Sequence, residues 1–193
     1  MEKLIGREKE QAELRRCYEA ERSEFVVIYG RRRIGKTFLA NNVYGESLAF
    51  HFTGYHNAPK ERQLELFAKA LQQCGQMSVL PKLDSWYHAF DALEQVLSAR
   101  RQKGKKVLFF DEMPWVDTYN SGFVSALEGF WNAWAAQRDD VMLIACGSAT
   151  SWMSDKLIEN QGGLYNRVTS KIYLRPFSLA ETEQYYSQQH TQQ

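Results

Sequence analysis

One stretch decides the fold: Gly30-Arg31-Arg32-Arg33-Ile34-Gly35-Lys36-Thr37, which fits the pattern G-x-x-x-x-G-K-[ST] at every position. The two glycines allow the backbone to curl so that successive N–H groups point inward at phosphate oxygens. In this pattern the lysine reaches the β- and γ-phosphates of a nucleotide, and the hydroxyl of the last residue is a magnesium ligand. The alternative is a glycine turn that binds no ligand.

The flanking sequence favours phosphate binding. A β-branched and aromatic run at Phe25–Tyr29 predicts a strand buried on both faces, and a helix is predicted from Lys36 to Tyr44. Strand, loop and helix in this order are the context that the pattern requires, and the helix N-terminus adds partial positive charge. The residues predicted to bind the nucleotide here are Gly30, Arg31, Arg32, Arg33, Ile34, Gly35, Lys36, Thr37 and Phe38.

The three consecutive arginines, Arg31 to Arg33, leave two interpretations open. One of them could contact phosphates or an acidic partner. Alternatively all three decorate an exposed loop and point to water, which is the interpretation that we favour.

Apolar runs and amphipathic segments alternate along the rest of the chain. Strands are predicted at 25–29, 48–53, 107–110, 141–146 and 171–174, and helices at 7–21, 36–44, 60–74, 85–101, 120–137 and 178–189. Asp84 or Ser85 is the predicted N-cap of the fourth helix. This alternation predicts an α/β domain with a mostly parallel sheet covered on both faces. Ligands of such sheets bind at the carboxyl ends of the strands, where the motifs of this chain fall.

Length and composition set limits on the class of protein. The 193 residues suggest one domain, and the net charge of +1 gives no global attraction to nucleic acid or anionic membrane. The three cysteines have no zinc-binding or C-x-x-C spacing and are expected to be reduced thiols. No stretch approaches the roughly 20 apolar residues of a membrane span. We therefore expect a cytoplasmic protein without a membrane partner.

Two carboxylates follow the third predicted strand. Asp111 is expected to hold the magnesium ion together with Thr37, and Glu112 to orient and deprotonate the attacking water. A buried strand that ends in two acids is common, so this feature is weak alone. It gains weight because the chain already has a phosphate-binding loop.

Two further features allow two interpretations each. Ser148, at the end of the fourth strand, either hydrogen-bonds the γ-phosphate or the attacking water, or it is a simple turn serine or the N-cap of a helix that opens at Ala149. Five aromatic residues could stack on bases, but their helical spacing favours core packing. They are Trp115, Phe130, Trp131, Trp134 and Trp152.

With these residues assigned, the chain resembles the archaeal-type ATPases of the AAA/STAND group of prokaryotic P-loop ATPases. The resemblance covers nearly the whole chain and rests on an ordered set of motifs. Besides the phosphate loop they are Ile5-Gly6-Arg7-Glu8, Phe109–Trp115, Cys146–Met153, Gly163–Arg167 and Arg175–Ser178.

The resemblance implies a three-layer P-loop NTPase domain with a five-stranded core, in which the phosphate-loop strand is central and is flanked by the strand ending at Ser148. It implies that Ile5, Gly6 and Arg7 lie near the adenine. It also implies that Ser148 is a sensor of the γ-phosphate, and that Arg167 approaches the same phosphate as a further catalytic residue together with Lys36. Relatives usually continue into a helical lid and a winged helix, so residues 1–193 resemble an N-terminal fragment that lacks both.

The residues support three functions. The first is an ATPase that uses ATP and Mg²⁺ to drive a switch or motor, with a protein or nucleic-acid partner contacted through regions absent from this chain. The second is a nucleotide-gated binding module with little hydrolysis, against which the water-activating Glu112 argues. The third is a small-molecule kinase, for which we find no acceptor site or arginine-rich lid. A GTPase is disfavoured because no N-K-x-D segment occurs.

Overall fold

Five strands form a single sheet in the order β2-β3-β4-β1-β5. The structure, a computed structural model, describes residues 6–45, 48–148, 150–159 and 163–190. The strands are β1 (Glu24–Gly30), β2 (Leu48–Thr53), β3 (Lys106–Asp111), β4 (Val141–Ser148) and β5 (Ser170–Leu174). Every neighbouring pair is parallel, which confirms the predicted α/β class and makes the sheet fully rather than mostly parallel. β1 lies between β4 and β5, one strand from the edge, so the prediction that it is central was wrong.

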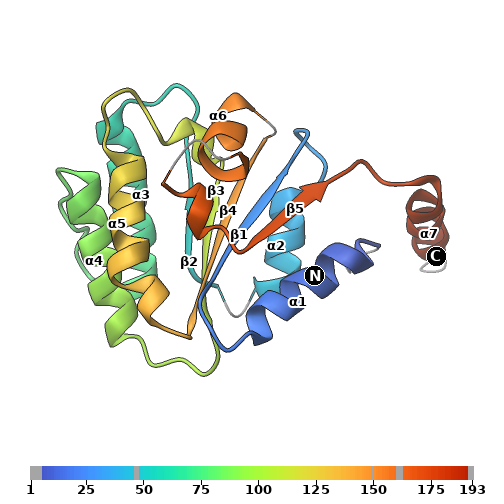
Figure 1. Cartoon of the computed structure of the whole chain (residues 1–193), viewed down its shortest axis with the longest axis horizontal. Helices are drawn as coiled ribbons and strands as arrows, with labels where there is room; N and C mark the ends of the chain where they lie inside the picture. The colour runs from blue at the N-terminus through green and yellow to red at the C-terminus, as the bar shows by residue number, and fades with distance from the viewer. Residues whose placement is uncertain (1–5, 46–47, 149, 160–162, 191–193) are drawn as a thin grey trace.

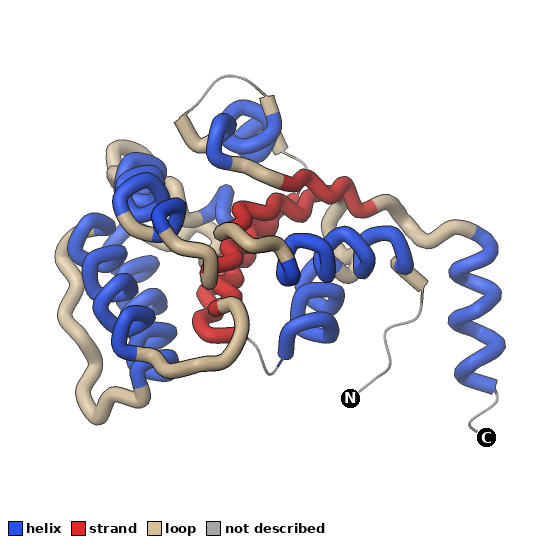
Figure 2. The backbone as a smooth tube through the Cα atoms, turned by 60° about the horizontal axis from the view of Figure 1, so that its bottom comes forward, coloured by secondary structure: helices blue, strands red, loops and turns tan. Residues whose placement is uncertain are grey.

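Helices cover both faces of this sheet (Figure 1). The α-helices of the described residues are α1 (Glu8–Glu19), α2 (Lys36–Tyr44), α3 (Lys60–Gly75), α4 (Trp86–Ala99), α5 (Phe123–Ala133), α6 (Ser151–Met153) and α7 (Leu179–His190). The first two lie on one face, and α3, α4 and α5 lie on the other. Helix α7 stands apart from these layers at the end of an extended segment that follows β5 (Figure 2).

The sheet separates two hydrophobic cores. On β1, Phe25 and Val27 belong to the larger core under α3, α4 and α5, whereas Val26 and Ile28 belong to the smaller core under α1 and α2. Burial on both faces explains why this strand reads as a continuous apolar run instead of an alternating one. The predicted core packing is confirmed for three aromatic residues of the larger core, which are Phe130, Trp131 and Trp134.

Helix boundaries follow local backbone signals. Ser85 is the N-cap of α4, as predicted, and its side chain accepts a hydrogen bond from the His88 amide at 3.1 Å. Helix α5 is shorter than the predicted 120–137. It begins after Gly122, whose φ of 76° is left-handed, and it ends where Trp134 leaves the helical region. A short 3₁₀ turn at 135–137 follows.

Because the strands are parallel, the loops that follow them lie together along the edge formed by the carboxyl ends of the strands. In the register of the pairs, Gly30 lies opposite Ser148 on one side and Leu174 on the other. Thr53 lies opposite Asp111. The residues predicted to bind phosphate and magnesium therefore occupy the same edge.

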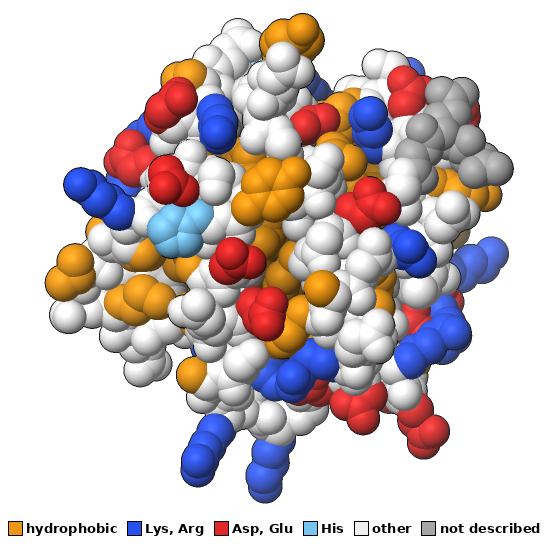
Figure 3. Space-filling view, turned by 60° about the vertical axis from the view of Figure 1, so that its left-hand side comes forward, with side chains coloured by type: hydrophobic (Ala, Val, Ile, Leu, Met, Phe, Trp, Pro, Cys, Tyr) orange, Lys and Arg blue, Asp and Glu red, His pale blue; other side chains and the backbone are white. Residues whose placement is uncertain are grey.

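The outer surface over α3 and α4 mixes side-chain types. Hydrophobic side chains are scattered there among acidic, basic and polar ones (Figure 3). Exposed hydrophobic residues in this part of the chain are Val79, which follows α3, and Tyr87, which belongs to α4. In the described part of the chain, no helix combines the length and the apolar character needed to span a membrane.

Gly30→Ala tests the tight junction between β1 and β5. A Cβ atom at this glycine would lie 2.3 Å from the Leu174 carbonyl oxygen, which is backbone and cannot rotate away. We expect the free energy of unfolding in urea to fall by about 1–3 kcal/mol, as for other overpacked sites. The control is Gly45→Ala, where a Cβ meets no atom within 4 Å and the change should stay below about 1 kcal/mol. Equal effects of the two substitutions would contradict this account.

Candidate functional site

The loop between β1 and α2 holds the Lys36 side chain inside its own curve. Gly35, the N-cap of α2, has a φ of 85°, and Arg33 also has a positive φ of 61°. The Lys36 ammonium donates to the Gly30 carbonyl at 3.3 Å and to the Arg31 carbonyl at 2.6 Å. It is 6% exposed. The loop thus fixes a positive charge at the place where the pattern predicts phosphate.

Thr37 and Asp111 meet across the edge of the sheet. The Thr37 hydroxyl donates to Oδ2 of Asp111 at 2.6 Å, and the Glu112 amide donates to Oδ1 at 2.9 Å. Asp111 is buried, and β-strand alternation places it on the α2 side of the sheet with Phe109. Both residues predicted to bind magnesium are therefore in contact.

These two oxygen ligands fit Mg²⁺. Within the described residues no group of three or more His, Cys, Asp or Glu side chains could hold a metal ion. A cation beside Thr37 and Asp111 would need further oxygen ligands from phosphate and water. Mg²⁺ binds in this way, with one or two protein ligands, substrate phosphates and retained waters.

Glu112 sits in a strained and partly desolvated position. Its φ of 50° is left-handed, a conformation that costs an L-residue about 1–2 kcal/mol. Burial is the main reason why the pKa of its carboxyl is raised, and the charge of Asp111 raises it further. The charges of Lys36 and Arg32 act in the opposite direction. The proton affinity of the carboxyl is therefore increased, and the two cations offset part of this increase.

Ser148 remains in strand β4 and caps no helix. Helix α6 begins at Ser151 with Thr150 as its N-cap, so the capping interpretation of Ser148 was wrong; Ala149 lies outside the described residues. The Ser148 hydroxyl is buried and, among the described residues, has no hydrogen-bond partner. An unpaired buried hydroxyl costs about 1–3 kcal/mol, so a polar ligand at this edge would relieve the cost.

The three arginines are all exposed, as the favoured interpretation predicts, but Arg32 does not only face water. Its guanidinium carbon lies 5.2 Å from the centroid of the Trp115 ring. Ile34 is half-buried against the smaller core, and Phe38 is an exposed residue in the first turns of α2.

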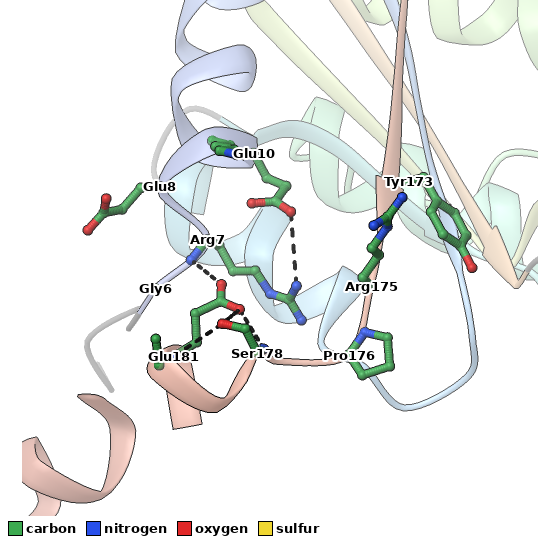
Figure 4. A pocket seen from close by; sticks show the side chains of 11 residues that line it. Gly6, Arg7, Glu8, Glu10, Tyr173, Arg175, Pro176, Ser178 and Glu181 are labelled. Carbon is green, nitrogen blue, oxygen red and sulfur yellow. Dashed lines mark hydrogen bonds and ion pairs between the residues drawn. The ribbon is translucent and has the colours of Figure 1, made fainter. Parts of the chain in front are cut away.

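Gly6 and Arg7 line a cavity of about 640 Å³ (Figure 4). Residues from the end of β5 and the start of α7 line its other side. The Arg7 guanidinium donates to the Ile34 carbonyl at 3.4 Å and lies 4.4 Å from the Phe177 ring centroid. The cavity therefore adjoins the phosphate loop and has the size of a small-molecule site. That it receives the adenine stays a prediction, and Ile5 lies outside the described residues.

Arg167 belongs to the segment between α6 and β5 and not to the end of a strand. It is exposed in a 3₁₀ turn at Tyr165–Arg167, beside Leu164 and Val168, which pack on the larger core. No hydrogen bond or ion pair joins its guanidinium to the phosphate loop, Asp111 or Glu112. Its catalytic role stays a prediction.

Sequence reasoning missed two side chains that shape the site. Gln63 is fully buried and hydrogen-bonds Tyr55 and the Trp115 carbonyl, so it ties the loop after β2 to the turn after β3. A glutamine in an amphipathic helix gives no signal of such a role. Trp115 was assigned to the core, but it is half-buried and contacts both Arg32 and the His56 ring.

Comparison with known proteins assigns the family. The pattern of a family described as an ATPase domain predominantly from Archaea matches residues 4–192. The chain belongs to this family. An uncharacterized protein of Methanocaldococcus jannaschii is 26% identical over 183 residues, which are 95% of this chain and 38% of that protein.

Solved structures share the fold of this ATPase domain. A Walker-type ATPase of Pyrococcus abyssi aligns with a TM-score of 0.67 and 18% identity over 98% of this chain and 59% of that one. The ORC1 protein of Aeropyrum pernix, solved in complex with DNA, aligns with a TM-score of 0.65 and 15% identity over 99% of this chain and 51% of that one. The chain thus spans between about two fifths and three fifths of the length of these proteins.

Lys36→Ala should weaken nucleotide binding because its ammonium is the buried charge in the loop. A charge-assisted contact of about 1.5–3 kcal/mol corresponds to a loss of about ten- to hundredfold in affinity, measured by calorimetric titration. The control is Lys105→Ala, a buried lysine that also donates to two carbonyls, those of Arg22 and Asp139, at the opposite edge of the sheet. It should lower the melting temperature and leave nucleotide affinity unchanged. An unchanged affinity in Lys36→Ala would remove this lysine from the site.

Proposed function

We propose that this ATPase domain binds ATP with Mg²⁺ and hydrolyses it, and that the nucleotide state acts as a switch or motor on a partner. The observation that carries the proposal is the meeting of four groups at one edge of the sheet. They are the enclosed Lys36 ammonium, the paired Thr37 and Asp111 side chains, and the adjacent Glu112 carboxyl.

The proposed chemistry assigns each group a separate task. Lys36 and the loop amides bind the β- and γ-phosphates, and Thr37 and Asp111 would hold Mg²⁺. When bound, the ion neutralises charge on these phosphates. Glu112 accepts a proton from water as the water oxygen attacks the γ-phosphorus and the bond to the bridging β-γ oxygen breaks, giving ADP and phosphate. Its raised proton affinity suits a base.

The Ser148 hydroxyl, which finds no hydrogen-bond partner in the part of the chain that the structure describes, supports a nucleotide at this edge. It lies opposite Gly30 in the β1–β4 register and on the same face of β4 as Cys146, which packs toward α1 and α2. It is proposed to hydrogen-bond the γ-phosphate or the attacking water. This hydrogen bond would be present with ATP and absent with ADP, so Ser148 would distinguish the nucleotide before hydrolysis from the nucleotide after it.

Arg7 supports the proposed switch. Its side chain reaches the Ile34 carbonyl in the phosphate loop, while its backbone amide donates to Glu181 of α7 at 3.2 Å. A displacement of the loop on nucleotide binding would thus reach α7 through one residue. The partner, a protein or a nucleic acid, is proposed to contact regions outside the ATPase domain.

Nucleotide preference and metal dependence test the first half of the proposal. We expect calorimetry to show ATP binding that requires Mg²⁺ and that weakens on addition of a chelator. GTP should bind more weakly, because the chain has no N-K-x-D segment to read guanine. Equal or tighter GTP binding would contradict the preference for ATP.

Glu112→Gln tests hydrolysis. Glutamine keeps the shape but accepts no proton, so we expect single-turnover hydrolysis to slow by about 10²–10⁴ while ATP affinity stays near the parent level. Asp111→Asn should instead weaken Mg²⁺-dependent binding itself. Glu61→Gln, at an exposed carboxylate in the first turn of α3, is the control and should change neither quantity. Parent-like turnover in Glu112→Gln would favour the nucleotide-gated module over the ATPase.

A further inference from the structure

Arg32 is distinguished from its two neighbours by an aromatic platform. Its guanidinium carbon lies 5.2 Å from the centroid of the Trp115 ring, a distance typical of cation–π contact. The side chain belongs to the phosphate loop, whereas the ring belongs to the turn after β3. The contact therefore joins the two segments that bring Lys36 and Glu112 to the site.

The platform is fixed from several directions. The Trp115 carbonyl accepts a hydrogen bond from the buried Gln63 at 3.0 Å, and its amide donates to the Glu112 carbonyl at 3.0 Å. The His56 ring lies against the indole with centroids 5.1 Å apart. Trp115 thus has little freedom to follow a moving arginine, so the ring restrains the guanidinium.

The position of Arg32 relative to Glu112 indicates which phosphate it faces. The Trp115 ring that Arg32 contacts belongs to the turn that begins directly after Glu112, and the Trp115 amide donates to the Glu112 carbonyl. In the proposed function, which this inference rests on, Glu112 acts on the water that attacks the γ-phosphate. A cation near Glu112 therefore lies at the γ-phosphate end of the site.

We propose that Arg32, restrained by Trp115, contacts the γ-phosphate and makes the site prefer nucleoside triphosphates over diphosphates. Trp115 is then a positioning residue, because it acts only through Arg32. A diphosphate offers no group at this end of the site, so its affinity does not depend on the arginine. Through Arg32 and Trp115, the turn after Glu112 would respond to whether a γ-phosphate is bound.

The test compares the affinities for ADP and for a non-hydrolysable ATP analogue, both with Mg²⁺, by calorimetry. Arg32→Ala should weaken analogue binding about ten- to hundredfold and leave ADP binding nearly unchanged. Since Arg32 is exposed, this variant is expected to fold and can carry the test alone. Trp115→Leu should weaken analogue binding about two- to fivefold, and Trp115→Phe should restore most of the affinity because it keeps a ring.

A double variant separates positioning from direct binding. Arg32→Ala with Trp115→Leu should bind the analogue no more weakly than Arg32→Ala alone, because the ring has nothing left to position. The control is Arg138→Ala, which removes another arginine–tryptophan contact, with Trp134 at 4.9 Å, at the opposite edge of the sheet. Its ratio of analogue to ADP affinity should equal that of the parent.

Two results would overturn the inference. Equal losses for analogue and ADP in Arg32→Ala would make the arginine a general source of positive charge. Additive losses in the double variant would show that Trp115 acts independently of Arg32. Either result, in a protein that still hydrolyses ATP through Glu112, leaves the proposed function standing. A parent protein that binds no ATP would instead contradict the proposed function.

Discussion

The hydrogen bond between Thr37 and Asp111, at 2.6 Å, is the contact on which the geometry of the site depends. It joins the first turn of α2, the helix after β1, to the end of β3, and β4 lies between β1 and β3 in the sheet. Because the strands are parallel and in register, β1, β3 and β4 all end beneath this contact. A shift of one residue in either pair would reverse the face on which Asp111 or Ser148 lies.

The same edge concentrates polar groups in unfavourable settings. Lys36 is enclosed, Glu112 is left-handed and partly desolvated, and the Ser148 hydroxyl has no partner among the described residues. Each of these features opposes stability, while the two apolar cores on either side of the sheet supply it. Such strain gathers at functional sites, where the surrounding structure determines the conformation. Here the rigid sheet below the edge holds these groups in their strained conformations.

Sequence patterns predicted the parts of the fold that depend on local periodicity. The helix at Lys36–Tyr44 and the strand at Leu48–Thr53 have the predicted bounds, because apolar spacing and the loop pattern specify both. The family resemblance implied that β1 is central, whereas β1 lies one strand from the edge; local patterns could not correct this, because strand order depends on long-range pairing. The length of α5 was overestimated because the aromatic spacing runs as far as Trp134 and no glycine or proline follows at 135–137, although the backbone leaves the helix at Trp134.

The candidate site also has features that the sequence predicted and features that it could not predict. The contact between Thr37 and Asp111 followed from two motifs and the rule that parallel strands end at one edge. The roles of Gln63 and Trp115 could not be predicted, since a glutamine looks ordinary in an amphipathic helix and a single tryptophan in a turn gives no periodic signal. Their positions are set by loops packing against each other, which sequence periodicity does not describe.

Glu181 links the two ends of the described chain. Its Oε2 accepts from the amide and hydroxyl of Ser178, and the Ser178 hydroxyl in turn accepts from the Glu181 amide, so the pair forms a capping box for α7. Its Oε1 accepts from the Arg7 amide. One carboxylate therefore protects backbone amides at positions 7 and 178 at once. Fraying of the first turn of α7 and solvent exchange at Arg7 become a single local unfolding event, shared by segments about 170 residues apart.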